Sequence, residues 1–182
     1  MRAYRLRLWI LTVVRMTERS KLYVWREAGQ GSAMFPVPDP MRRALDAARD
    51  AALAGEVPVG AVVMLKGEVI AVAANAPRAL NDPTAHAEML AIRAAAARLG
   101  RDRLEDCDLW VTLEPCAMCA GAIAHARIAR LYYAAADAKG GAVEHGPRFF
   151  GQPTCHHRPE VYAGIAEGEA AGLLRGFFAG RR

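Results

Sequence analysis

Two short segments of this 182-residue chain carry side chains that are typical of a metal site. The first is His86-Ala87-Glu88, and the second is Pro115-Cys116-Ala117-Met118-Cys119. One imidazole and two thiolates form a zinc ligand set that leaves the fourth tetrahedral position to water, whereas structural zinc sites usually close all four positions. The residue types therefore predict a zinc ion that takes part in chemistry, held by His86, Cys116 and Cys119.

Glu88 has a different role from these three side chains. It lies only two residues from His86, so the two do not share one face of a helix, and Glu88 is not expected to be a fourth ligand. A carboxylate at this spacing can reach a water in the open position, accept its proton and pass that proton to a substrate and its leaving group. The sequence therefore predicts Glu88 as the general acid and base.

Each motif alone has a simpler interpretation. A Cys-x-x-Cys pair can be a redox pair or two small core residues, and a histidine in an alanine-rich helix is usually a packing residue. The combination favours the metal site. Cys107 and Cys155 lack such a spacing and are interpreted as free thiols, and Cys155-His156-His157 is a much weaker metal candidate.

Local patterns place both motifs at the starts of helices. Asp39-Pro40 and Asp82-Pro83 each combine an N-cap with a proline suited to the first turn, so helices are expected from there to about Gly55 and Leu99. A helix from Cys116 to His125 would put the thiolates at its positive end. Apolar or β-branched stretches predict strands at 57–64, 68–74, 109–113, 128–134 and 161–165, and a last helix at 167–178.

This order of elements predicts an α/β fold with three layers, α/β/α, around a central mixed sheet of about five strands. Residues 39–182 would form this single domain. Residues 1–38 are expected to be an N-terminal extension that is either disordered or the product of a mis-assigned start. The apolar stretch 8–14 within it is short, ends at Arg15 and has no cleavage site after it, which argues against a signal peptide.

The basic character of the chain comes from that extension. The formal net charge is +5, and residues 1–33 hold seven basic and two acidic side chains, which is the whole excess. Global charge therefore does not argue for a nucleic-acid partner of the remaining domain. No apolar stretch approaches the roughly 20 residues that span a bilayer, and four cysteines are too few for a disulfide scaffold.

The longer strings around the motifs resemble the bacterial tRNA-specific adenosine deaminases, a family of the zinc-dependent cytidine/deoxycytidylate deaminase superfamily. H-x-E followed by P-C-x-x-C is the signature of zinc-dependent nucleobase deaminases. The likeness extends over about residues 39 to 180 and is carried by the strings 56–62, 81–88, 111–122 and 137–141. It implies a cytidine-deaminase-like fold and hydrolytic deamination of adenosine to inosine at the wobble position (34) of a tRNA anticodon.

The resemblance also implies a set of contacts. One Zn²⁺ per subunit would be held by the three ligands above, with Glu88 as the catalytic residue, while Asn75 and the backbone N–H of Ala87 would contact the base. The partners would be a tRNA anticodon stem-loop, usually of an arginine tRNA, and a second copy in a homodimer, with no membrane and a cytoplasmic location. An unstacked loop base suits extrusion into a pocket.

The contacts to the rest of the RNA are less defined, because the segment 142–157 differs from the commoner version in the family. Part of the RNA surface is expected there and on the last helix, although an ordinary solvated charge is an equally good interpretation of each residue. The candidates are Lys139, Arg148, His156, His157, Arg158, Arg175, Arg181 and Arg182.

Two other functions are compatible with the same motifs. A deaminase of a free base or nucleoside, such as guanine, cytosine or cytidine, shares the metal signature. A non-catalytic zinc-binding module would use the same ligands without turnover.

Overall fold

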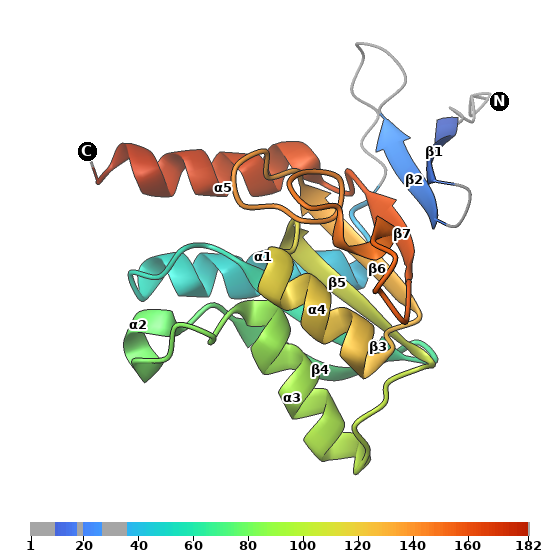
Figure 1. Cartoon of the computed structure of the whole chain (residues 1–182). Coiled ribbons are helices and arrows are strands. Elements are labelled where there is room, and N and C mark those ends of the chain that lie inside the picture. Colours follow the sequence, from blue (N-terminus) through green and yellow to red (C-terminus); the bar gives the residue numbers. More distant parts are fainter. Residues whose placement is uncertain (1–9, 18–19, 27–35, 182) are drawn as a thin grey trace, which may run out of the picture.

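The computed structural model describes residues 10–17, 20–26 and 36–181. Its centre is a mixed seven-stranded sheet in the order β1-β2-β7-β6-β5-β3-β4 (Figure 1). The strands are β1 (Ile10–Thr17), β2 (Ser20–Arg26), β3 (Gly60–Leu65), β4 (Glu68–Ala74), β5 (Cys107–Leu113), β6 (Arg130–Ala135) and β7 (Glu160–Ala163).

Helices cover both faces of this sheet. Helices α1 (Asp39–Leu53) and α5 (Glu167–Ala179) pack on one face, and α3 (Ala87–Leu99) and α4 (Ala117–Ala126) pack on the other. A short helix α2 (Pro77–Leu80) and a 3-10 turn η1 (Phe149–Gly151) lie in the connections. The three-layer α/β/α architecture and the five strands expected for the domain, β3 to β7, are confirmed.

Strand β3 shows how the two layers of helices share one sheet. Successive side chains of a strand point to opposite faces. Ala61 and Val63 accordingly belong to the core under α3 and α4, while Val62 and Met64 belong to the core under α1 and α5. All four are buried, which explains why the strand is a continuous apolar run in sequence.

The directions of the strands decide where the motifs meet. Strand β3 is antiparallel to both β4 and β5, so β4 and β5 run the same way, and β6 and β7 are parallel to β5. The carboxyl ends of β4 and β5 therefore lie at the same edge of the sheet, which is where open α/β sheets place their ligands. Asn75 directly follows β4, and the segment Glu114-Pro115-Cys116 directly follows β5.

One helix begins later than expected. The sequence placed its start at Asp82-Pro83, but the structure begins α3 at Ala87 with His86 as the N-cap residue. The Asp82 carboxylate accepts hydrogen bonds from the backbone N–H and the hydroxyl of Thr84, at 2.8 and 2.7 Å, and so stabilises a local turn instead of a helical one.

The N-terminal extension also differs from the expected disorder in two stretches. Strand β2 pairs in parallel with β7, with Leu22 opposite Val161, and β1 pairs with β2. Without β2, the backbone of β7 would be an unpaired sheet edge, which favours addition of a strand. Residues 1–9, 18–19 and 27–35 lie outside the described residues, and the domain boundary at residue 39 and the alternative start stay predictions.

Gly60 is a position where the packing of α1 on β3 leaves no room for a side chain. A Cβ there would overlap the carbonyl oxygen of Ala44 and lie 2.8 Å from the nitrogen of Ala48, both backbone atoms of α1. We expect Gly60→Ala to lower the free energy of unfolding by about 3 kcal/mol, because neither backbone can move freely. Thermal denaturation should show a fall of roughly 2–4 °C in Tm per kcal/mol.

The matched control is Gly172→Ala in α5. A Cβ there would have nothing within 4 Å beyond its own helix, and the substitution should stabilise the protein by about 1 kcal/mol because alanine is the better helix former. A Gly60→Ala protein as stable as the wild type would contradict the packing assigned to α1.

Candidate zinc centre

Three side chains from two helix starts meet at the carboxyl edge of the sheet. The Nδ1 atom of His86 lies 3.7 Å from the sulfur of Cys116 and 3.5 Å from the sulfur of Cys119, and the two sulfurs are 3.6 Å apart. Among the described residues, they are the only group of three histidine, cysteine or acidic side chains close enough to hold a metal ion. The structure therefore brings together the ligands expected from the sequence.

The distances between these atoms fit a tetrahedral zinc ion. With Zn–S bonds of about 2.3 Å and Zn–N bonds of about 2.0–2.1 Å, tetrahedral angles place two sulfurs about 3.8 Å apart and a sulfur and a nitrogen about 3.6 Å apart. The observed separations agree with both values within about 0.2 Å. The donor set of one imidazole and two thiols also matches zinc in chemical type.

Local backbone structure explains why the ligands face one another. Cys116 and His86 are the N-cap residues of α4 and α3, and each carbonyl accepts the first intrahelical hydrogen bond, from Ala120 and Leu90 respectively. Cys119 lies one turn into α4 and is completely buried. The positive ends of both helix dipoles therefore point at the site and favour thiolate over thiol.

The two thiols differ in acidity. The hydrogen bond between the sulfurs, together with that to His86, lowers the pKa of Cys116 to about 4. The same sulfur–sulfur hydrogen bond, together with burial, raises the pKa of Cys119. Cys116 is therefore the thiol that more readily supplies the thiolate a divalent cation requires.

Glu88 lies in the first turn of α3, beside the ligands but outside their set. Its side chain is buried, with 4% of the residue exposed, and burial raises the pKa of the carboxyl. A carboxylate with a raised pKa in a dry site accepts and returns a proton readily near neutral pH. This is the position expected of a general acid and base.

Asn75 and Ala87 are joined directly. The backbone N–H of Ala87 donates a hydrogen bond of 2.8 Å to Oδ1 of Asn75, and Asn75 is itself nearly buried. The bond ties the end of β4 to the start of α3. The N–H of Ala87 was expected to face a substrate base, but here it orients the asparagine side chain, leaving the Nδ2 group of Asn75 without a partner among the described residues.

Two buried carboxylates were missed in the sequence analysis. Glu56 accepts hydrogen bonds of 2.9 Å from the backbone N–H groups of Arg78 and Ala79 and so supports the loop beyond Asn75. Glu114 accepts backbone hydrogen bonds from the segment that follows β6. The available signal was a single acidic residue beside a mainly apolar run, Glu56 before Val57 and Glu114 after Leu113.

The candidate RNA contacts are spread over separate places. Lys139 and Arg148 are exposed in the connection after β6, and Arg175 is exposed on α5. His157 instead donates from Nε2 to the carbonyl of Ile128 at 2.7 Å, and Arg158 donates to the carbonyl of Gln152 at 3.2 Å, so both are engaged in local structure. These five side chains come from the connections after β6 and before β7 and from α5, and three of them are exposed.

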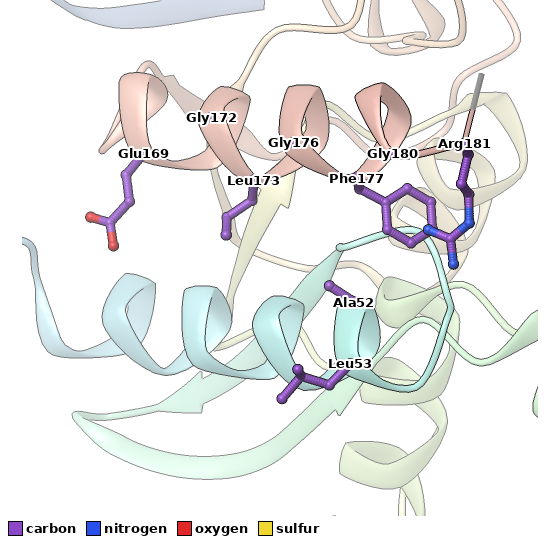
Figure 2. Close-up of a pocket in the computed structure, with 9 residues that line it drawn as sticks. All are labelled: Ala52, Leu53, Glu169, Gly172, Leu173, Gly176, Phe177, Gly180 and Arg181. Atoms are coloured by element: carbon purple, nitrogen blue, oxygen red, sulfur yellow. The ribbon is translucent and has the colours of Figure 1, made fainter.

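One groove in the described part of the chain lies away from the metal cluster. Figure 2 shows this groove of about 760 Å³ between α1 and α5, on the face of the sheet opposite α3 and α4. The guanidinium of Arg181 lies 3.6 Å from the centre of the Phe177 ring at its end. None of the motif residues lines the groove. No helix in the described part of the chain is long and apolar enough to cross a membrane.

Comparison with known proteins agrees with this geometry. The profile of the cytidine and deoxycytidylate deaminase zinc-binding region matches residues 38–135. The chain is 60% identical over 142 residues to the tRNA-specific adenosine deaminase of Agrobacterium fabrum, an overlap of 78% of this chain and 93% of that protein.

Solved structures of deaminases also resemble this chain. A structure from a study of A-to-I editing by tRNA:A34 deaminases at the wobble position of transfer RNA superposes with a TM-score of 0.74 at 60% identity, covering 74% of this chain and 98% of that one. Guanine deaminase from Bacillus subtilis superposes with a TM-score of 0.54 at 43% identity, over 56% of this chain and 66% of its own.

Removal of one sulfur ligand should abolish tight metal binding. We expect Cys116→Ala to lose its zinc on dialysis, because two remaining ligands hold the ion far more weakly than three. Metal analysis of the purified protein measures this directly. The matched control is Cys155→Ala, which removes a buried thiol outside the cluster and should keep the wild-type zinc content. Equal zinc in both variants would refute the ligand set.

Proposed function

Because the chain belongs to the family of the cytidine and deoxycytidylate deaminase zinc-binding region, we propose that it deaminates adenosine to inosine at the wobble position of a tRNA anticodon. One observation supports the chemistry above all: three zinc-type ligands converge beside the buried carboxylate of Glu88. The choice of adenosine in tRNA rests on the 60% identity to a tRNA-specific adenosine deaminase over nearly the whole length of that protein.

Different residues have different roles in the proposed hydrolysis. His86, Cys116 and Cys119 would hold Zn²⁺, which supplies an activated water for attack at C6 of adenine. Glu88 accepts one proton of the water and passes it to the ring nitrogen of adenine, then accepts the second and passes it to the departing amine, which leaves as ammonia. Its burial excludes bulk water from these transfers and raises the pKa of its carboxyl, so that one group can serve in both directions.

The base would be held by Asn75. Its Oδ1 is occupied by the N–H of Ala87, which fixes the orientation of the amide and directs Nδ2 away from the helix. The Nδ2 group is then a donor for an acceptor atom on the purine. This assignment makes the hydrogen bond from Ala87 a positioning contact for the substrate-binding residue.

An anticodon loop is a suitable substrate for this site. Its bases are unpaired, so extrusion of the wobble nucleotide costs little free energy. We keep an arginine tRNA in the cytoplasm as the proposed natural substrate, as the family resemblance implies. Because residues 34–182 hold equal numbers of acidic and basic side chains, affinity for RNA would come from individual arginine and lysine contacts instead of a general positive field.

A deaminase of free guanine is the second candidate. The likeness to guanine deaminase from Bacillus subtilis favours it, at 43% identity. The superposition covers less of both chains than that with the tRNA deaminase structure, and its TM-score is lower. The two functions share the metal chemistry and differ in whether the substrate is a loop nucleotide or a free base.

A direct test offers the purified protein an anticodon stem-loop with adenosine at position 34, in parallel with free adenosine, guanine and cytidine. We expect inosine only in the stem-loop, detected by nuclease digestion and mass spectrometry. Glu88→Gln should keep its zinc and lose at least about 100-fold in rate, because a general acid–base group contributes about 10²–10⁴-fold. Ammonia release from guanine alone would establish the second candidate instead.

We also propose that the enzyme is a homodimer formed through α4. The helix has the sequence AMCAGAIAHA, with His125 as its one charged or strongly polar side chain, yet Met118, Ala122 and Ala124 are only partly covered. A helix that is apolar all round is normally buried, and a second copy of the chain would bury this face.

Sedimentation equilibrium at micromolar concentration checks the homodimer. We expect about twice the 19.7 kDa mass of one chain. The substitution Ala122→Glu, at a partly covered position of α4, should shift the mass toward that of one chain, because a buried unpaired carboxylate is costly in an interface. A monomeric wild-type protein would contradict the proposal.

A further inference from the structure

The first part of the connection after β6 is hydrogen-bonded to Pro115 and Cys116, the segment that begins α4. We define residues 137–149 as the strap. Gly141 of the strap forms an antiparallel bridge with Cys116, and the N–H of Ala142 donates a hydrogen bond of 2.9 Å to the carbonyl of Pro115. Phe149, at the other end of the strap, lies against Gly121 of α4. The strap thus covers the turns of α4 that present the two cysteine ligands.

The carboxylate of Glu114 is the centre about which the strap folds. Oε1 accepts three backbone N–H groups, from Val143, Glu144 and His145, at 3.0, 2.8 and 3.0 Å. Oε2 accepts the N–H of Asp137 at 2.9 Å and lies 2.7 Å from Nδ1 of His145. The side chain of Glu114 has no exposed surface, and burial is outweighed by these bonds, which lower the pKa of its carboxyl. Nδ1 of His145 is therefore the donor.

The fit of the strap around this carboxylate is tight. A Cβ on Gly141 would lie 2.5 Å from the carbonyl oxygen of Asp137 and 2.5 Å from Cδ of Glu114, distances that real atoms do not adopt. The path of the strap is therefore determined by the carboxylate of Glu114. His145 contributes the one side-chain hydrogen bond to this carboxylate, and the other four come from backbone N–H groups.

Near the end of the strap, the backbone of Arg148 is held in an unusual conformation. Its backbone has φ +48°, a left-handed conformation that arginine rarely adopts and that persists only when the surroundings impose it. Its Nε donates to the carbonyl of Glu144 at 3.0 Å, which orients the guanidinium. The carboxylate of Glu144 is engaged by the hydroxyl of Tyr133 and does not pair with the arginine.

Several other exposed arginines of the described residues differ from Arg148 in this respect. Many of them pair with a carboxylate, including Arg42, Arg43, Arg101 and Arg130. Arg148 is exposed and has no acidic partner within ion-pair distance in the described part of the chain, so both of its Nη groups are free to donate. An arginine fork held by its Nε and open at its two Nη atoms is suited to bind a phosphate in bidentate fashion.

We propose that Arg148 binds a backbone phosphate of the substrate RNA beside the target nucleotide, and that Glu114 and His145 are its positioning residues. The inference rests on the proposed function, because it takes RNA as the ligand. Glu114 connects the two sites: it precedes Pro115 and Cys116 in the chain and holds the strap that carries Arg148. Glu114 would therefore hold the zinc ligands and the phosphate contact at a fixed distance from each other.

The first test measures RNA binding apart from turnover. All variants are made on the Glu88→Gln background, and the Kd for a labelled anticodon stem-loop is measured by fluorescence anisotropy at several salt concentrations. Arg148→Ala should raise Kd about tenfold, as expected for the loss of a charged hydrogen-bond pair, and should reduce the slope of log Kd against log salt by about one. The control Arg43→Ala removes an exposed arginine of α1, on the face of the sheet opposite α3 and α4, and should change neither quantity.

The second test asks whether His145 acts through Arg148. His145→Ala should raise Kd as Arg148→Ala does, and the double variant should be no weaker than either one, because coupled residues are not additive. His145→Asn keeps an N–H donor near the position of Nδ1 and should restore binding. Zinc content should be unchanged in all of them. Additive effects, or no rescue by asparagine, would overturn the positioning role.

The outcomes separate this inference from the proposed function. If the protein with Glu88 intact binds the stem-loop but forms no inosine, the proposed function fails while the binding test still decides the role of Arg148. If inosine forms and Arg148→Ala binds with unchanged Kd and salt slope, the inference fails alone. If no RNA binds, both fail.

Discussion

The site depends on the parallel direction of β4 and β5. Both strands end at the same edge of the sheet, and each is followed by a turn and a helix that runs back across the same face. Two helix N-termini are therefore brought side by side, and His86 and Cys116, as the N-cap residues, face each other across 3.7 Å. If β4 and β5 were antiparallel, their carboxyl ends would lie at opposite edges of the sheet, and the two motifs would be separated by the length of a strand.

A second constraint is that the loops at this edge need buried partners for their backbone N–H groups. Burial of an ionised carboxylate costs several kcal/mol, but a hydrogen bond to a charged group contributes about 1.5–3 kcal/mol. Glu114 accepts five such bonds, from four backbone N–H groups and His145, so the sum of these contacts exceeds the cost of burial. Glu56 has a similar role on the other side of the site, with two backbone N–H groups.

Much of the domain follows from local pattern. The hairpin around Lys66-Gly67 lies where turn chemistry places it, because such a turn depends on neighbours in sequence. Helix α1 begins at the expected place, but Asp39 is its first residue and not its cap: the N-cap residue is Pro38, and no side chain caps the helix. The start of α3 was wrong by four residues because an aspartate followed by proline can begin a turn as well as a helix, and the hydroxyl of Thr84 decides between them. The pairing of β2 with β7 was missed because it joins residues more than 130 positions apart.

The sequence by itself determined the chemistry of the site: the ligand types, the spacing that separates Glu88 from His86, and the position of Cys116 and Cys119 at a helix start. Side-chain chemistry and spacing within one turn are local properties, so they can be read from the order of residues. The tertiary structure alone decided that Asn75 is oriented by the N–H of Ala87, that Glu114 organises the strap, and that Arg148 is held in a left-handed conformation with no acidic partner among the described residues. These contacts join segments from different strands and loops, and they exist only because the sheet brings the ends of those segments to one edge.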